Sequence, residues 1–172
     1  MLTVVFISTY IIPILFLFIL KKRNRIEDFH LKTIKERKLP IFFFAAITSL
    51  LAFRLLEIKI MNLLSLSFFG ASLALFLVFV LFHFKVKTSL HTLAIGGLTG
   101  FVILISYHFK IQILIIISTL FIVFGLIAYS RLKLKAHSNL EIYLGFILGV
   151  TTQFIVYYLI PITLKLLQNI PN

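Results

Sequence analysis

The sequence contains no cysteine and very little charge. Its 172 residues include no Cys and only 5 Asp and Glu, and charged residues make up 13% of the chain. Without cysteine there is no thiol catalysis, thiolate metal site or redox switching, and 7 Gly are too few for a collagen-like chain. A soluble domain is typically ~25% charged, so the low charge excludes an ordinary water-soluble protein.

Apolar residues take the place of the missing charge. Hydrophobic residues make up 61% of the chain, including 20 Phe, and the mean hydropathy is +1.14. A membrane-spanning helix needs ~20 mostly apolar residues. The segments that approach this length are Leu2–Leu20, Leu39–Phe53, Met61–Phe84, Leu90–Tyr107, Ile111–Tyr129 and Leu140–Ile160. The sequence therefore predicts an all-α polytopic membrane protein, a six-transmembrane-helix bundle in which residues 1–172 form a single integral membrane domain.

The second and sixth segments have the least regular boundaries. The second segment is short for a span unless Arg54 extends its side chain to the interface. The basic stretch before it, Lys21–Lys38, is interpreted as a mostly solvated interfacial helix. Pro161 is expected to end the sixth helix, followed by an amphipathic tail to Asn172.

The positive charge is distributed unevenly over the predicted loops. The net charge is +12, but the basic residues interrupt apolar segments, so topology and anionic lipid headgroups explain them better than nucleic acid, which is not expected as a partner. Of the 17 Lys and Arg residues, all but Arg54, Lys59, Lys110 and Lys165 follow the first, third or fifth segment. These loops are predicted to be cytoplasmic and both termini outside, in a bacterial inner membrane. The first segment, which lacks a cleavage site, is expected to be a retained helix.

Two segments carry glycines four residues apart, Gly96 with Gly100 and Gly145 with Gly149. Small residues at this spacing allow two helices to approach closely in lipid. The favoured interpretation is packing between helices of this chain, and the alternative is homodimerisation.

Two polar clusters lie at the entrances of the fourth and sixth segments, at Lys87–His91 and Ser130–Glu141. The loop order places both on one membrane face. Arg and Lys beside helix N-termini bind anions. His137 and Glu141 are four residues apart, so the carboxylate can orient the imidazole if that turn is helical, and His91 can protonate a leaving group. These features suggest phosphoryl transfer at a lipid headgroup. The alternative is ordinary basic flanks with two incidental histidines.

The spacing of these residues resembles a known pattern. Ser130-Arg131, His137 and Glu141 follow the spacing Ser-Arg-x5-His-x3-Asp, with Glu in place of Asp, and Ser89 and His91 fit part of Pro-Ser-Gly-His. These are the third and second signatures of the type-2 phosphatidic acid phosphatase superfamily. The chain resembles a small, divergent bacterial-type member, and the resemblance extends to six helices with these signatures before the fourth and sixth.

The resemblance implies a role for each matching residue. His137 corresponds to the nucleophile that forms a phosphohistidine, and Glu141 to the carboxylate that orients it. His91 corresponds to the general acid. Ser89 and Arg131 correspond to residues that contact the phosphate. The resemblance implies no metal ion and no cofactor.

The first signature, Lys-x6-Arg-Pro, matches only in part. Counting back from Pro40 places Lys32 at the lysine, which is thereby a candidate substrate-binding residue, but Leu39 at the arginine. Arg37 or Lys38 can substitute only if the helix start is shifted.

The expected function is hydrolysis of a lipid phosphate monoester or diphosphate, with membrane lipids and a lipid phosphate substrate as partners. The second signature departs from the family pattern, with Thr88 for Pro and Leu90 for Gly. The alternative is therefore a catalytically inactive relative that binds lipid or serves as an accessory subunit of a membrane complex. A channel or transporter lacks support because no span interior carries a charge pair.

Overall fold

The computed structural model describes residues 2–29, 31, 33–57 and 62–168, and every regular element within them is a helix. In chain order these are α1 (Leu2–Phe6), the π-helix η1 (Ile7–Ile11), α2 (Ile12–Lys22), α3 (Ile34–Leu56), α4 (Asn62–Leu81), the 3-10 helix η3 (Phe82–Phe84), α5 (Leu90–Phe109), α6 (Leu114–Lys133) and α7 (Asn139–Gln168). Six helical segments of the described chain, with α1, η1 and α2 forming the first, are long and apolar enough to cross a membrane. The predicted all-α six-helix membrane bundle is confirmed.

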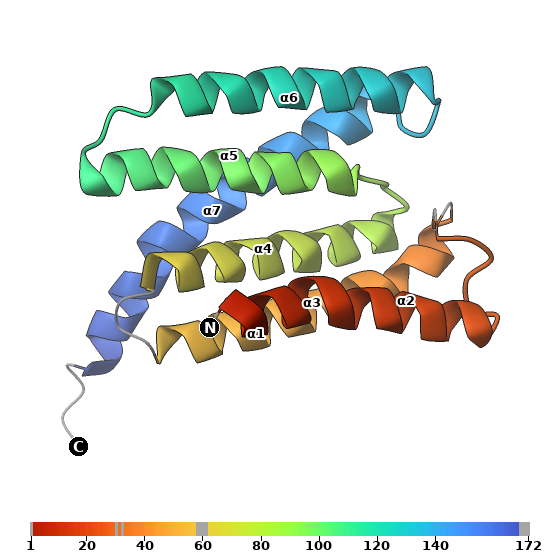
Figure 1. Cartoon of the computed structure of the whole chain (residues 1–172), viewed down its shortest axis with the longest axis horizontal. Helices are drawn as coiled ribbons and strands as arrows, with labels where there is room; N and C mark the ends of the chain where they lie inside the picture. Colours follow the sequence, from red (N-terminus) through yellow and green to blue (C-terminus); the bar gives the residue numbers. More distant parts are fainter. Residues whose placement is uncertain (1, 30, 32, 58–61, 169–172) are drawn as a thin grey trace.

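The helix α7 is the element against which the others are assembled. In Figure 1, α6, α5, α4 and α3 follow one another, the N-terminal helices lie next to α3, and α7 crosses behind them. Its main partners are α5 and α4, while α3 packs on α4. By contrast, α6 contacts α5 and has no buried residue. Large apolar side chains remain exposed around the bundle, as Ile115 on α6 does at 84%, where lipid would cover them.

The α5–α7 contact depends on the paired glycines. A Cβ atom on Gly96 would lie 2.3 Å from the carbonyl oxygen of Phe146, and one on Gly149 would lie 2.3 Å from that of Leu93. Neither backbone oxygen can move away cheaply, so a residue with a side chain cannot occupy these positions without separating the helices. The prediction that the glycine pairs join helices within this chain is confirmed.

The second span begins earlier than the sequence analysis expected. Thr33 Oγ1 accepts a hydrogen bond from the Glu36 N–H at 3.3 Å, and Glu36 Oε2 accepts one from the Thr33 N–H at 3.4 Å. This capping box starts α3 at Ile34 rather than Leu39. The helix reaches 23 residues, so its length does not depend on the side chain of Arg54.

The interpretation of Lys21–Lys38 as one solvated interfacial helix is wrong. The helix α2 ends at Lys22, and the described residues between it and Ile34 form turns and irregular backbone. Ile26 and Leu31 are buried with Leu20 in a small apolar cluster. Burial of these side chains packs the loop against the end of α2.

The expected end of the last helix at Pro161 is also wrong, because α7 continues to Gln168. Proline removes one backbone donor, and membrane helices often tolerate this loss within their length. The last part of the expected tail, residues 169–172, lies outside the described residues.

Candidate functional site

The polar residues singled out from the sequence gather at one end of the bundle, the right-hand end in Figure 1. Here α6 ends and α3, α5 and α7 begin. The site residues, with the elements that carry them, are Arg37 in the first turns of α3, Ser89 and His91 at the start of α5, Arg131 in the last turn of α6, and His137 and Glu141 at the start of α7.

His137 and Glu141 make the contact that their spacing suggested. Nδ1 of His137 lies 2.6 Å from Oε2 of Glu141, and the side chains are 5% and 21% exposed. His137 precedes the helix, because Ser138 Oγ accepts a hydrogen bond from the Glu141 N–H and caps α7. An ionised carboxylate only accepts hydrogen bonds, so Nδ1 carries the proton, and in the neutral ring Nε2 then holds the free lone pair. This is the tautomer that a nucleophilic imidazole requires.

A backbone hydrogen bond joins the two polar clusters. The N–H of Ser89 donates to the carbonyl oxygen of Glu141 at 3.1 Å. Ser89 also caps α5, because its Oγ accepts from the Thr92 N–H, and its side chain is fully buried. Ser89 therefore holds the helix starts together, and its hydroxyl oxygen is already engaged at the cap.

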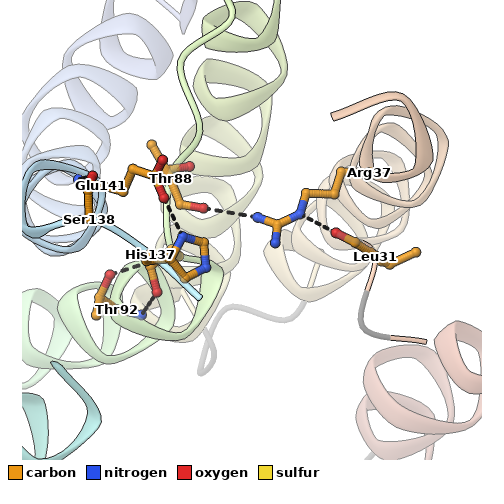
Figure 2. Close-up of polar contacts among 8 residues, drawn as sticks. Leu31, Arg37, Thr88, Thr92, His137, Ser138 and Glu141 are labelled. Carbon is orange, nitrogen blue, oxygen red and sulfur yellow. Dashed lines mark hydrogen bonds and ion pairs between the residues drawn. The ribbon is translucent and has the colours of Figure 1, made fainter. Parts of the chain in front are cut away.

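Arg37 reaches from α3 to the loop before α5, as Figure 2 shows. Its Nε donates to the carbonyl oxygen of Leu31 at 2.6 Å and its Nη1 to that of Thr88 at 3.4 Å. The residue is only 9% exposed, and the Glu141 carboxylate lies within electrostatic range of it. These two bonds use two of the five N–H donors of a guanidinium.

Arg131 and His91 complete the cluster. His91 is exposed on the first turn of α5, and it lies within electrostatic range of Arg131, His137 and Arg37. The two histidines are thus within electrostatic range of one another and of two arginines. The two arginines near the exposed imidazole of His91 make this end of the bundle positively charged.

Two buried polar atoms at the site have no hydrogen-bond partner within the described part of the chain. They are Oγ1 of Thr88, a residue with no exposed surface, and Nε of Arg131. An unpaired buried polar group is costly, and such groups in native structures commonly await a ligand, ion or water. Thr88 lies within the predicted polar cluster Lys87–His91, but the sequence analysis assigned it no role in the site, and no local pattern indicates that its hydroxyl is buried.

The structure brings five of the six predicted site residues to one place, and the sixth, Lys32, lies outside the described residues. Arg37 brings a second arginine to this cluster, at a position that the sequence analysis named only as a substitute if the helix start is shifted. The capping-box pattern from Thr33 to Glu36 gives the true helix start, and Arg37 then shares a buried face with Pro40 and Ile41. That pattern is readable from the sequence.

No protein-family model matches the chain, and neither a curated protein nor a solved structure matches it at a significant level. Within the described residues, no group of three or more His, Asp or Glu side chains is placed to hold a metal ion.

The arrangement has the components for binding and attacking an anion. Arg37 and Arg131 supply fixed positive charge, and the backbone N–H groups at the start of α5 add a partial positive charge. The buried imidazole of His137, held by Glu141, lies just before α7 within electrostatic range of His91, an exposed imidazole on α5. A phosphate group matches these features in charge and in hydrogen-bonding capacity.

Proposed function

We propose that this membrane protein is a lipid phosphatase-like hydrolase, which cleaves a lipid phosphate monoester or diphosphate through a phosphohistidine, as the type-2 phosphatidic acid phosphatases do. The observation that carries the proposal is the His137–Glu141 contact of 2.6 Å, at a site that also contains Arg37, Arg131 and His91. A carboxylate that fixes the imidazole tautomer beside cationic groups is the arrangement that nucleophilic catalysis on a phosphate requires.

In the first half-reaction, Nε2 of His137 attacks the phosphorus atom. An N–P bond forms while the bond between phosphorus and the lipid oxygen breaks, and His91 donates a proton to that leaving oxygen. Glu141 stabilises the positive charge that develops on the His137 ring. Arg37 and Arg131 balance the charge on the phosphoryl oxygens.

In the second half-reaction, water attacks the phosphorus of the phosphohistidine. His91, now neutral, accepts a proton from that water. The N–P bond breaks, inorganic phosphate leaves, and both histidines return to their starting protonation. The steps need no oxidant, reductant or cofactor.

The proposal places the protein in a bacterial inner membrane, with the site at the cytoplasmic face and both termini outside. The concentration of Lys and Arg in the loops at the site supports this orientation. The lipid substrate reaches the site from that leaflet.

The decisive experiment is phosphate release by the purified protein in detergent. Long-chain phosphatidate and an isoprenyl diphosphate are the substrates, with a chelator present. We expect release by the wild-type protein and none by His137→Ala, while His108→Ala, a histidine in the last turn of α5, serves as the control. Failure to release phosphate from either lipid, or equal release by His137→Ala, would contradict the proposal.

The second candidate is a relative that binds a lipid phosphate without turning it over, as an accessory subunit of a membrane complex. The observation that favours it is the complete burial of Ser89, whose hydroxyl caps α5 instead of facing a ligand. Under this alternative, the wild-type protein binds long-chain phosphatidate but releases no phosphate, and a partner protein co-purifies with it.

A further inference from the structure

An apolar groove lies beside the candidate site. Its volume is about 510 Å³, and its walls come from α3, α4, α5 and α7. The helices α4 and α5 contact one another only sparsely and both pack on α7, which leaves the groove between them. Representative lining residues are Phe44, Ala71, Leu90, Ala94, Gly97 and Gln153.

The polar groups along the groove are engaged within the protein. Nε2 of Gln153 donates to the carbonyl oxygen of Ser67 at 3.2 Å, and Ser67 Oγ donates to that of Leu64 at 2.7 Å. The Thr152 hydroxyl donates to the carbonyl oxygen of Gly149. The remaining lining is mostly Phe, Leu, Ala and Gly. The groove therefore suits an apolar occupant that makes no demand for hydrogen bonds.

One end of the groove lies next to the site along α5. Leu90, in its lining, stands between Ser89 and His91 in the chain. At the other end lies Phe101 on the same helix. At 1.5 Å per residue this stretch of α5 is about 16 Å long, which is close to half of the ~30 Å hydrocarbon thickness of a bilayer. The groove thus spans about one leaflet.

We infer that the groove holds the hydrocarbon chain of the lipid whose phosphate is bound at the site, and that it makes the protein selective for long-chain phosphates. The inference rests on the proposed function for the identity of the headgroup. Cations at one end and an apolar wall along one leaflet complement a single molecule with an anionic head and an aliphatic tail. Such a molecule enters sideways from the bilayer, between α4 and α5.

Gly97 offers a way to fill the groove from within. A Cβ atom there would meet only Nε2 of Gln153 at 3.6 Å and the carbonyl oxygen of Gly149 at 4.0 Å, so Gly97→Ala fits and Gly97→Leu extends into the groove. Gly125 on α6 is the matched control, since a Cβ atom there has nothing within 4 Å. Ala94→Phe is a second obstruction, for use if Gly97→Leu does not fold.

The first measurement compares phosphate release from hexadecyl phosphate and butyl phosphate, which share a headgroup. We expect the wild-type protein to prefer the long chain. Gly97→Leu and Ala94→Phe should lower the ratio of the two rates at least tenfold, while Gly97→Ala and Gly125→Leu leave it near the wild-type value. An unchanged ratio in both obstructing variants overturns the inference, although the proposed function then stands.

The second measurement does not depend on turnover. Hexadecyl phosphate with a diazirine at the far end of its chain is photocrosslinked to the wild-type protein, and the labelled peptides are mapped by mass spectrometry. We expect labels on the lining segments of α4, α5 and α7, and their loss in Gly97→Leu. Labelling confined to α6 and the N-terminal helices overturns the inference. Groove labelling without phosphate release from any substrate supports the tail site and contradicts the proposed hydrolase.

Discussion

Arg37 owes its position to the residues that accept its hydrogen bonds. Leu31 has a positive φ of 47°, a conformation that costs a bulky residue about 1 kcal/mol or more, and in it the Leu31 carbonyl accepts the guanidinium Nε–H. The Thr88 carbonyl accepts from Nη1. Burial of Leu31 with Leu20 and Ile26 holds the first acceptor in place. Under the proposed function, a charge fixed in this way is organised before the substrate arrives, which is the condition for electrostatic stabilisation of a transition state.

Arg37→Lys retains the charge and removes the planar set of donors. An ammonium group cannot donate to the Leu31 and Thr88 carbonyls in the same geometry and still face a phosphate. By analogy with the loss of a single preorganised donor, we expect the rate of phosphate release to fall about 10²–10³-fold. The measurement is kcat and KM for long-chain phosphatidate.

The control for this prediction is Arg54→Lys. Arg54 lies at the other end of the same helix, with 79% of its side chain exposed in an ion pair with Glu57. We expect wild-type kinetics from this variant. If Arg37→Lys also retained wild-type kinetics, Arg37 would be a structural residue and no part of phosphate binding.

At the scale of elements, three capped helix starts assemble the site. Thr33, Ser89 and Ser138 each accept a hydrogen bond from the N–H three residues later. The first turns that follow carry Arg37, His91 and Glu141 respectively. Because a cap defines where its helix begins, it also defines the direction in which these side chains project. The three capping residues, which are local features of the sequence, thus determine how the site side chains are arranged.

The α5–α7 crossing maintains the spacing between two of these starts. Gly96→Ala places a methyl group 2.3 Å from the Phe146 carbonyl oxygen, and overpacking of this kind costs roughly 1–3 kcal/mol. We expect a lower Tm in detergent and weaker phosphate release, since the Ser89–Glu141 backbone bond spans the same pair of helices.

Gly125→Ala is the matched control, because its new methyl group meets no protein atom within 4 Å. Alanine favours helix over glycine by roughly 1 kcal/mol, so this Tm should stay the same or rise. Equal Tm values for the two variants would show that the close approach at Gly96 contributes nothing to stability.

The sequence predicted the six spans and the close α5–α7 contact correctly, but it did not predict the structure of the basic stretch Lys21–Lys38. Hydropathy identifies apolar runs, and the spacing of Gly145 and Gly149 identifies a close helix contact. Neither signal shows where a charged segment stops being helical, so the buried apolar cluster around Ile26 was missed. His137 and Glu141 were found together because four residues bring them into reach locally. The burial of Thr88 was not predicted, because it depends on elements distant in sequence.

At the scale of the whole molecule, the distribution of charge predicts an orientation of the bundle in the membrane. The stretches Lys21–Lys38 and Arg131–Lys135, each made of helix ends and the residues between or after them, hold most of the 17 Lys and Arg residues, and α3 begins and α6 ends at the site. Positively charged loops are retained on the cytoplasmic side. The same charges attract anionic lipid headgroups, at about 1 kcal/mol for each residue near the surface. Under the proposed function, one distribution of charge serves both orientation and the supply of an anionic substrate.

The absence of native cysteine makes this orientation directly measurable, because any introduced cysteine is the only thiol. Lys135 and Lys110 are a matched pair: both are exposed, both follow a helix, and both have left-handed backbone, with φ of 49° and 53°. They lie at opposite ends of the bundle, Lys135 near the site. On intact bacterial cells, a membrane-impermeant maleimide should label Lys110→Cys, whereas Lys135→Cys should react only after the membrane is opened. The reverse pattern would place the site outside the cytoplasm, where its lipid phosphate would have to come from the other leaflet.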